Sequence, residues 1–579
     1  MAHDEDINMT DTTSRGTQKP TNVNAETIEA IKDEQYAGAR DKAGQVLKEG
    51  GHSVVVTPSE NKRILRKIDL AILPIILVVY CLQSLDKTSL AYASVFGLIE
   101  HAHLVGDQYS WLGAIVYVAQ LVWQPVVAYM LVKFPIGKFC AIMVFCWGTV
   151  LCGMTAARGF GSLMAARFLL GSFEASVAPT FIAIVQMWYR RSEQTNRNAA
   201  WYSMLATLAD KEIQLGVVNI FGSLLTYGLA HIKSNVLYPY QVSYTAMGVS
   251  DTSLDLRTDE RMQIIFLFCG LLTVVFSVVI FFFLPDSPWQ ARFLKGDDRL
   301  LAIERLRMNQ MGISSGQWRW DHVKECLLDP KTWLWFSMIT AVSIPSGGIS
   351  TFGPLIIEAF GFSSFSTILF NMPFGAVQLV ATLGSAFAAT HFKMKSPILA
   401  GLCIFPIIGI SILLGIDYTK QNRGVLLFGY YTTSLYPAIS PLIYSWSGQN
   451  TAGDTKRKFT TAMLFVGASA GNILGPHLYR PSEAPHYTRG LTANLAMFVA
   501  IIVIVGLGAA WIKILNKRHA AMRVRLGKSE TIVDLSMENK RTLAAHDEAV
   551  NDGEAAGGVG DKAFDDITDL KNEDFVYVL

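Results

Sequence analysis

The sequence has little charge for its length. Charged residues make up 17% of its 579 positions, against about 25% in soluble domains. The formal net charge is +2, so neither a basic surface for nucleic acid nor an acidic surface is expected. The seven cysteines have no metal-ligand spacing and form no disulfide framework. The polar, acidic first residues do not resemble a cleavable signal peptide, so the first apolar run is expected to direct membrane insertion.

Catalytic signatures are also missing. No His-Glu-x-x-His pattern and no nucleophile elbow appear in the chain. Gly527-Lys528-Ser529 resembles the end of a phosphate-binding loop, but Met522 stands where the upstream glycine is required. We therefore expect neither an enzyme nor an ATP-driven pump, and no cofactor or metal.

What the sequence does have is long apolar runs, within an overall hydrophobic content of 51%. Twelve runs are long enough to cross a bilayer. Six precede a basic middle segment and six follow it, which predicts an all-α membrane protein with twelve transmembrane helices in two six-helix bundles. The runs cover approximately 68–90, 108–132, 139–157, 161–188, 199–230, 263–284, 332–358, 364–390, 396–416, 424–446, 459–478 and 492–515.

The runs divide the chain into five predicted parts. Residues 1–61 form a disordered tail, 62–284 the first bundle, 285–331 a middle loop, 332–516 the second bundle and 517–579 a second tail, disordered beyond Ser529. Lys and Arg concentrate in both tails, the middle loop and every second connection, so these parts are predicted to be cytoplasmic. The basic cluster after the last run also suits anionic lipid, although the same charges are explained by membrane orientation alone. A monomer is expected.

The fourth run carries two full charges. Arg167 and Glu174 are seven positions apart, which places them two helical turns apart on one face. A charge at mid-membrane depth costs a few kcal/mol or more unless it faces protein, water or a partner. One interpretation is a polar transport path in which Glu174 binds and releases a proton. The other is a buried structural ion pair with a neighbouring helix.

The first run ends in a second polar group, Asp86-Lys87. Neighbouring residues point about 100° apart on a helix, so the two do not pair along one face. They either lie at the outer water interface, or Asp86 faces the same cavity as Glu174. Two carboxylates among the cations Lys87 and Arg167 would suit proton coupling, and the cations would attract an anionic substrate.

The second half offers neutral polar groups and helix breakers instead. Its Gly and Pro positions, such as Gly347, Gly348 and Gly475-Pro476, are more typical of kinks and close packing than of a site. The side chains that we expect to line a site are Asn371, Gln378 and Tyr431.

Four motifs together resemble a known family. These are Leu82-Gln83-Ser84-Leu85-Asp86-Lys87-Thr88-Ser89-Leu90, Tyr109-Ser110-Trp111-Leu112-Gly113, Arg167-Phe168-Leu169-Leu170-Gly171 with Glu174-Ala175, and Leu284-Pro285-Asp286-Ser287-Pro288. They resemble fungal allantoate permease-type transporters, in the anion:cation symporter branch of the major facilitator superfamily, over residues 62–520. The basic loop typical of the superfamily is degenerate here, because Phe134-Pro135-Ile136-Gly137-Lys138 lacks the usual acid.

The resemblance implies the major facilitator fold and proton symport by alternating access. It implies that Asp86 with Lys87, and Glu174 with Arg167, carry the proton. The implied partners are protons, the lipid bilayer and a small organic anion such as allantoate, ureidosuccinate or a vitamin. The implied location is the plasma membrane. An exporter and a non-transporting nutrient sensor on the same fold remain alternatives.

Two segments depart from the family pattern. Residues 206–215 place Asp210, Lys211 and Glu212 inside the fifth run, and residues 242–263 separate Tyr240-Gln241 from the sixth. Val242-Ser243 can be encoded by a splice-donor sequence, and Gln214 and Gln263 can each end a splice acceptor. We hypothesise that both inserts are translated introns, which amplification of the spliced transcript would test.

Overall fold

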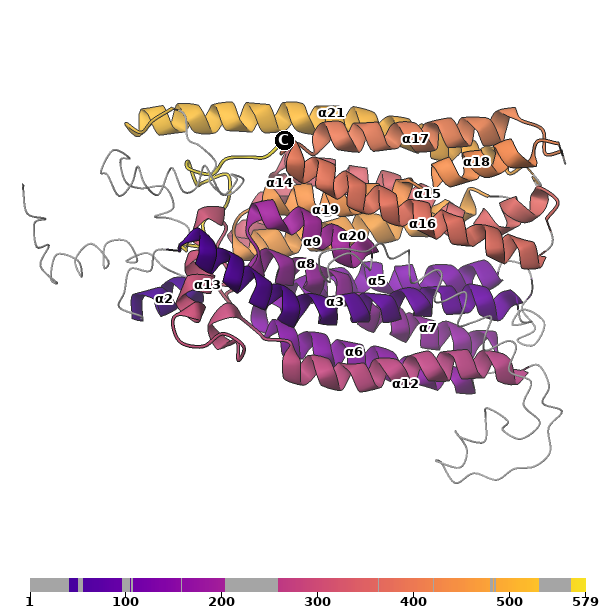
Figure 1. Ribbon diagram of the computed structural model, residues 1–579, viewed down its shortest axis with the longest axis horizontal. Helices are drawn as coiled ribbons and strands as arrows, with labels where there is room; N and C mark the ends of the chain where they lie inside the picture. The colour runs from indigo at the N-terminus through magenta and orange to yellow at the C-terminus, as the bar shows by residue number, and fades with distance from the viewer. Residues whose placement is uncertain are drawn as a thin grey trace, which may run out of the picture.

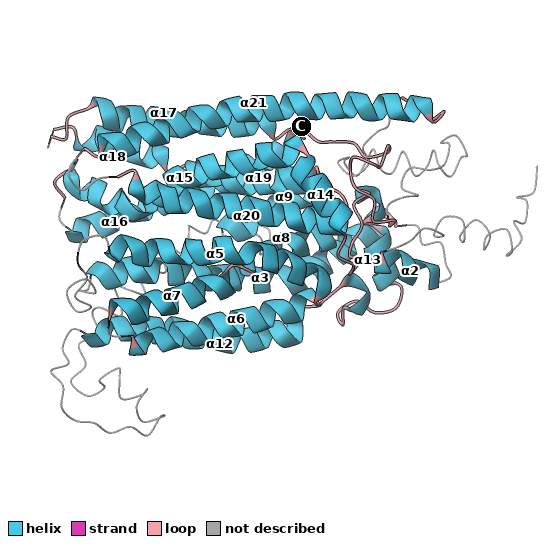
Figure 2. Ribbon diagram, turned by 180° about the vertical axis from the view of Figure 1, so that it is seen from behind, coloured by secondary structure: helices cyan, strands magenta, loops and turns pink. Residues whose placement is uncertain are grey.

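The computed structural model describes residues 41–49, 56–95, 105, 108–157, 159–203, 259–362, 364–419, 421–479, 483, 486–530 and 564–579. Every regular element within these ranges is a helix. The long helices lie side by side, with the N-terminal half on one side of the bundle and the C-terminal half on the other (Figure 1). The view from behind shows the same order (Figure 2).

The N-terminal half follows five of its six expected runs, whereas the fifth run, 199–230, lies outside the described residues after Ser203. Its helices are α3 (Pro58–Val95), α5 (Gln108–Lys133), α6 (Ile136–Gly153), α7 (Phe160–Glu174), α8 (Val177–Trp188), α9 (Arg191–Ser203) and α12 (Asp259–Phe283). The fourth run is thus two helices, α7 and α8, in one apolar stretch. The insert 206–215 lies outside the described residues, as does 242–258 of the second insert, whose last residues belong to α12.

The C-terminal half also follows the expected runs. Its helices are α15 (Pro330–Ala359), α16 (Ser364–His391), α17 (Ser396–Gly415), α18 (Arg423–Thr433), α19 (Ile439–Gln449), α20 (Asp454–His477) and α21 (Thr488–Arg525). The short 3-10 helix η4 (Tyr436–Ala438) joins α18 to α19. Among the described residues, six stretches are long and apolar enough to cross a membrane by length and composition.

Helix pairs within and between the halves hold the bundle together. In the first half α5 packs on α7 and α6 on α12; in the second, α15 packs on α20 and α17 on α21. The halves meet where α5 packs on α20 and α9 on α16. At Gly347 of α15, an added Cβ would lie 2.8 Å from the carbonyl oxygen of Asn472 on α20. This glycine therefore serves close helix packing, as the sequence favoured.

One end of the bundle carries most of the ordered connecting segments. It holds α2 (Lys42–Glu49), α13 (Asp298–Glu304), α14 (Trp320–Leu328) and residues 564–579 (Figure 1). The helices α3, α9, α15, α17 and α20 begin here, with basic residues at or next to their first turns. These are Arg63, Arg191, Lys331, Lys395 and Lys456. We call it the basic end.

Two expectations of disorder are wrong for part of each tail. Residues 42–49 form α2, and Asp41 before it accepts hydrogen bonds from the backbone N–H groups of Ile313 and Ser314. Residues 564–579 are packed against the helices, with Phe575 and Tyr577 at most 3% exposed. The composition of each whole tail was a poor guide to these segments, because contacts with distant parts of the chain bury the apolar side chains that each contains.

Candidate functional site

The inner face of α3 carries two buried polar side chains. Gln83 and Asp86 are three positions apart, so they share a face one turn apart. Their exposed fractions are 4% and 2%. The burial of Asp86 favours the interior over the water interface, which were the two alternatives that the sequence left open. The side chain of Lys87 lies outside the described part of the structure.

The two charges of α7 are buried as well, at 5% exposed for Arg167 and 2% for Glu174. The Nε of Arg167 donates to the carbonyl oxygen of Leu112 on α5 at 2.9 Å. One carboxylate oxygen of Glu174 accepts a hydrogen bond of 2.8 Å from the Nε2 of Gln83. The face on which Arg167 and Glu174 were predicted to lie therefore points into the bundle, and Glu174 connects α7 to α3.

The break between α7 and α8 lies directly after Glu174. A break in a membrane helix leaves backbone groups that need other partners. The side chain of Gln124 on α5 donates to the carbonyl oxygen of Ala175 at 3.0 Å. The hydroxyl of Ser176 donates to the carbonyl oxygen of Phe173 at 3.0 Å. These bonds stabilise the position of Glu174 at the end of its helix.

Asp86 has a partner on a third helix. The indole Nε1–H of Trp147, a fully buried side chain of α6, donates to its Oδ2 at 2.9 Å. Trp147, Gln83 and Gln124 were not among the residues predicted to line a site. Gln83 and Gln124 could have been identified from the sequence, because each is a glutamine inside an apolar run. The role of Trp147 has no local signal, because tryptophan is ordinary in a membrane span.

Aromatic rings continue from this site into the other half. Tyr80 lies three positions before Gln83 on α3, and its ring centroid is 5.6 Å from that of Tyr202 on α9. The ring of Tyr202 lies 6.0 Å from that of Tyr444 on α19. Tyr444 in turn stacks on Phe465 of α20 at 4.9 Å. The aromatic row spans the contact between the two bundles beside the buried carboxylates.

Of the polar side chains expected to line a site in the second half, the structure describes two. Gln378 on α16 and Tyr431 on α18 are half-buried, on two helices that pack together. The backbone carbonyl of Gln378 accepts a hydrogen bond from Thr382 at 2.8 Å. The side chain of Asn371 lies outside the described part of the structure.

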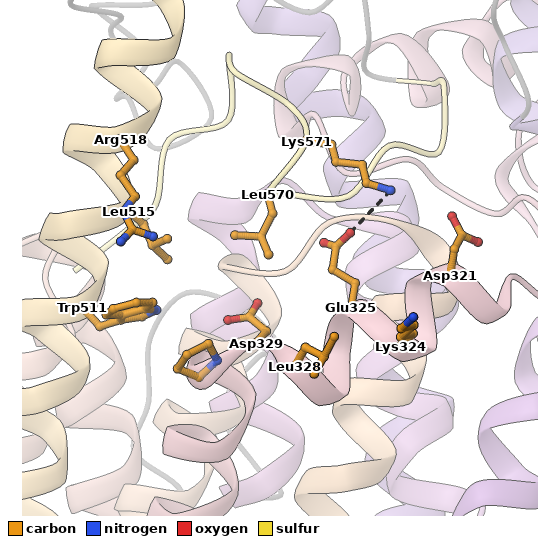
Figure 3. A pocket seen from close by; sticks show the side chains of 11 residues that line it. Asp321, Lys324, Glu325, Leu328, Asp329, Trp511, Leu515, Arg518, Leu570 and Lys571 are labelled. Atoms are coloured by element: carbon orange, nitrogen blue, oxygen red, sulfur yellow. Dashed lines mark ion pairs between the residues drawn. The ribbon is translucent and has the colours of Figure 1, made fainter.

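A surface cavity of about 400 Å³ lies at the basic end, away from the buried carboxylates. Trp511 and Arg518 of α21 form one wall and Leu328 at the end of α14 another (Figure 3). Leu570 and Lys571 of the C-terminal segment close the cavity, and Lys571 is 3.7 Å from Glu325. This cavity belongs to the surroundings of the C-terminal segment rather than to the site in the bundle.

Two packed helical halves with ionisable side chains buried between their helices define an integral multi-pass membrane protein of the transporter class. Residues 76–476 match the family model of the Major Facilitator Superfamily, and the chain belongs to that family. It is therefore a secondary transporter and not an enzyme, as the sequence predicted.

The chain is similar to named fungal transporters. It is 33% identical to the Thiamine pathway transporter THI73 of Saccharomyces cerevisiae, over 77% of this chain and 78% of the relative. It is 27% identical to the Allantoate permease of Saccharomyces cerevisiae, over 93% of this chain and 91% of the relative. A crystal structure of the E. coli fucose:proton symporter FucP shares the fold, with a TM-score of 0.51 at 11% identity, over 76% of this chain and 99% of FucP.

Proposed function

We propose that the chain takes up a small organic anion together with protons, as a member of the allantoate permease-type anion:cation symporter branch. The observation that carries the proposal is the pair of buried carboxylates, Asp86 and Glu174, on facing helices of the first half. Each accepts a hydrogen bond from a neutral donor, Trp147 or Gln83. Ionisable side chains carried into the membrane and turned inward are typical of proton relays in transporters.

The amide of Gln83 suits both protonation states of Glu174. Its N–H group donates to the carboxylate, and its own carbonyl oxygen is buried without a hydrogen-bond partner among the described residues. An amide carries both a donor and an acceptor. After rotation, that carbonyl accepts the proton of a neutral Glu174. One side chain thus supports Glu174 before and after it takes up a proton.

The substrate class follows from charge and from the relatives. Arg167, buried two turns from Glu174, supplies a cation inside the first half. Lys87, the residue after Asp86 in the sequence, carries a second positive charge. An allantoate permease and a thiamine pathway transporter are both similar to this chain over most of its length. We propose a small carboxylate as substrate, positioned between Arg167 and the polar residues Asn371, Gln378 and Tyr431 of the second half.

We further propose that the basic end faces the cytoplasm, in the plasma membrane, with both chain termini on that side and the transporter acting as a monomer. The basic residues at the starts of α3, α9, α15, α17 and α20 support this orientation.

The test is uptake of a panel of labelled carboxylates, allantoate, ureidosuccinate and nicotinate among them, by yeast that lacks its own transporters. Addition of the substrate should make the medium more alkaline as substrate accumulates. Asp86→Asn and Glu174→Gln should abolish accumulation against a gradient, because neither variant can carry the proton. Exchange of internal for external substrate should continue, since it requires binding but no net proton movement.

Asp417→Asn is the matched control, because it neutralises an exposed carboxylate outside the buried site. It should accumulate substrate as the unmodified protein does. If both buried-site variants accumulate substrate normally, the assignment of the proton to Asp86 and Glu174 is wrong. Export of the same substrates from loaded cells would reverse the proposed direction.

A further inference from the structure

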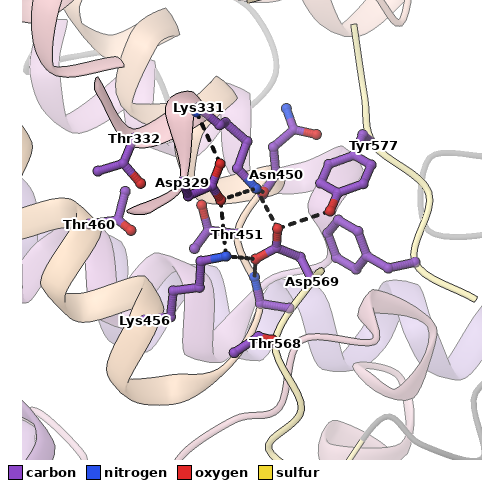
Figure 4. Close-up of polar contacts among 12 residues, drawn as sticks. Asp329, Lys331, Thr332, Asn450, Thr451, Lys456, Thr460, Thr568, Asp569 and Tyr577 are labelled. Atoms are coloured by element: carbon purple, nitrogen blue, oxygen red, sulfur yellow. Dashed lines mark hydrogen bonds and ion pairs between the residues drawn. The ribbon is translucent and has the colours of Figure 1, made fainter. Parts of the chain in front are cut away.

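The C-terminal segment 564–579 lies in a groove at the basic end, formed mainly by the second half. Thr568 and Asp569 are fully buried in this groove, and Phe564, Phe575 and Tyr577 nearly so. The segment lies against Lys331 in the first turn of α15, Lys456 in the first turn of α20 and Asn450 directly after α19 (Figure 4). It also contacts Asn516 of α21. Segment and groove therefore form an interface with a buried core.

The anchor of the segment is the carboxylate of Asp569. It accepts hydrogen bonds from the ammonium group of Lys331 on α15 and from the Tyr577 hydroxyl at 3.0 Å. The ammonium group of Lys456 on α20 lies 3.0 Å from it. Burial alone would raise the pKa of Asp569, but the two lysines lower it below its usual range. The segment thus supplies the negative charge that lets two cations be buried together.

The last residues are held through their backbone. The side chain of Asn450 accepts from the N–H of Val578 at 2.7 Å and donates to its carbonyl oxygen at 2.9 Å. Asn516 makes the same pair of bonds with Tyr577, each at 2.9 Å. Trp446 donates to the carbonyl oxygen of Val578 at 2.8 Å. These contacts all belong to the second half.

The segment also has contacts with the first half. Arg191, the first residue of α9, donates to the carbonyl oxygen of Val576 at 2.9 Å. Its guanidinium group lies over the ring of Phe575, 4.9 Å from the centroid. The same guanidinium donates to the carbonyl oxygen of Gln449 at the end of α19. The segment therefore reaches across the line where the two halves meet.

The halves touch each other directly beside this bridge. The hydroxyls of Thr195 on α9 and Ser445 on α19 are 2.8 Å apart, and both residues are at most 3% exposed. Asn196 on α9 accepts from Thr390 on α16 at 2.9 Å. In this structure the two halves are closed together at the basic end. Transport by alternating access requires them to separate there.

We propose that residues 564–579 act as a detachable latch, which holds the two halves closed at the basic end by binding the groove of the second half and Arg191 of the first. Opening breaks the contacts of Arg191 with Phe575 and Val576. Full release exposes the groove, where water replaces the carboxylate of Asp569 beside Lys331 and Lys456. The cavity beside Leu570 and Lys571 then merges with the groove.

The test measures opening directly. In a chain whose native cysteines are replaced, Ser445→Cys reports separation of the halves through its reaction with a membrane-impermeant maleimide, applied to the basic end in membrane vesicles. Deletion of residues 564–579 should raise the labelling rate about ten-fold or more, the equivalent of one charge-assisted hydrogen bond. A synthetic peptide of residues 564–579 should restore protection, and the same peptide with Asp569→Asn should not.

The matched control is Lys295→Cys, an exposed position in the middle segment, whose labelling should not change. Phe575→Ala tests the bridge to Arg191 while the Asp569 anchor remains, and it decides the question if the deletion variant fails to reach the membrane. Unchanged labelling of Ser445→Cys in either variant overturns the latch. The assay needs no substrate, so its outcome does not depend on proton coupling.

Discussion

The helices α7 and α5 cross closely at Gly171, which lies between Arg167 and Glu174. A Cβ added there would lie 2.5 Å from the carbonyl oxygen of Val116 and 2.9 Å from its Cα. Both atoms belong to the backbone of a long helix, so neither can rotate away. We predict that Gly171→Ala forces α7 away from α5.

The size of the effect follows from the overlap. The added carbon would be about 0.9 Å inside the 3.4 Å at which ordinary contacts begin. Overpacking of this kind typically costs about 1–3 kcal/mol, against a gain of about 0.5–1 kcal/mol from replacing glycine by alanine in a helix. Because Arg167 bonds to Leu112 on α5, the displacement also disturbs the buried site, and uptake should fall more than expression.

The assay compares detergent-extracted variants by thermal unfolding and by substrate uptake. Gly161→Ala is the matched control, because it lies on the same helix with nothing within 4 Å of the added carbon. Gly161→Ala should keep the melting temperature or raise it slightly, whereas Gly171→Ala should lower it by several degrees. Equal melting temperatures and equal uptake in the two variants would refute the reasoning.

Two further predictions concern the basic end. Arg305 is fully buried and donates to both carboxylate oxygens of Glu193 at 2.7 and 2.6 Å. Arg305→Gln removes these two bonds, while Glu193, with 13% of its side chain exposed, still accepts from the backbone N–H of Arg190. The loss should cost about 1–3 kcal/mol, measured as a melting temperature lower than that of the exposed-site control Arg299→Gln. Burial, with the neighbouring carboxylates Asp454 and Asp41, raises the pKa of Asp566 to about 6, against the lowering effect of Arg319. Asp566 thus binds its proton more tightly in the docked segment than in the free one, so acidification strengthens docking. Relative to a peptide with Asp566→Asn, the peptide 564–579 should gain about ten-fold in affinity for the deletion variant from pH 7 to pH 5. His322 and His519 also face the groove, but they affect both peptides equally. If the ratio of the two peptides' affinities does not change with pH, the assignment of the pH dependence to Asp566 is wrong.

Much of the fold was predictable because bilayer hydropathy is a local property. A run of about twenty apolar residues is a membrane helix whatever surrounds it, and the helices of the second half begin and end within a few residues of the predicted runs, except that α21 continues ten residues beyond its run and the run 424–446 contains both α18 and α19. The burial of Arg167 and Glu174 on one face followed from their spacing alone. The break between α7 and α8 did not, because Ala175-Ser176 contains neither glycine nor proline.

The partners of the buried charges could not be predicted from neighbouring residues in the sequence. Gln83 and Glu174 are 91 positions apart, and Arg191 and Val576 are 385 apart, so no window of sequence contains either pair. The C-terminal segment shows the difference most clearly, since the tail beyond Ser529 is acidic as a whole, although eight of the sixteen residues 564–579 are apolar. It is ordered because α15 and α20 bring Lys331 and Lys456 to one place and leave a groove for Asp569.

The sequence by itself therefore determined which stretches enter the membrane, and that charges carried into it must face inward. Only the tertiary structure decided what those charges face, how closely the helices cross, and that the C-terminal segment joins the two halves. The physical reason is that transfer into the bilayer is decided largely within each helix, whereas hydrogen bonds and ion pairs depend on side chains that only the folded chain brings within 3 Å of each other.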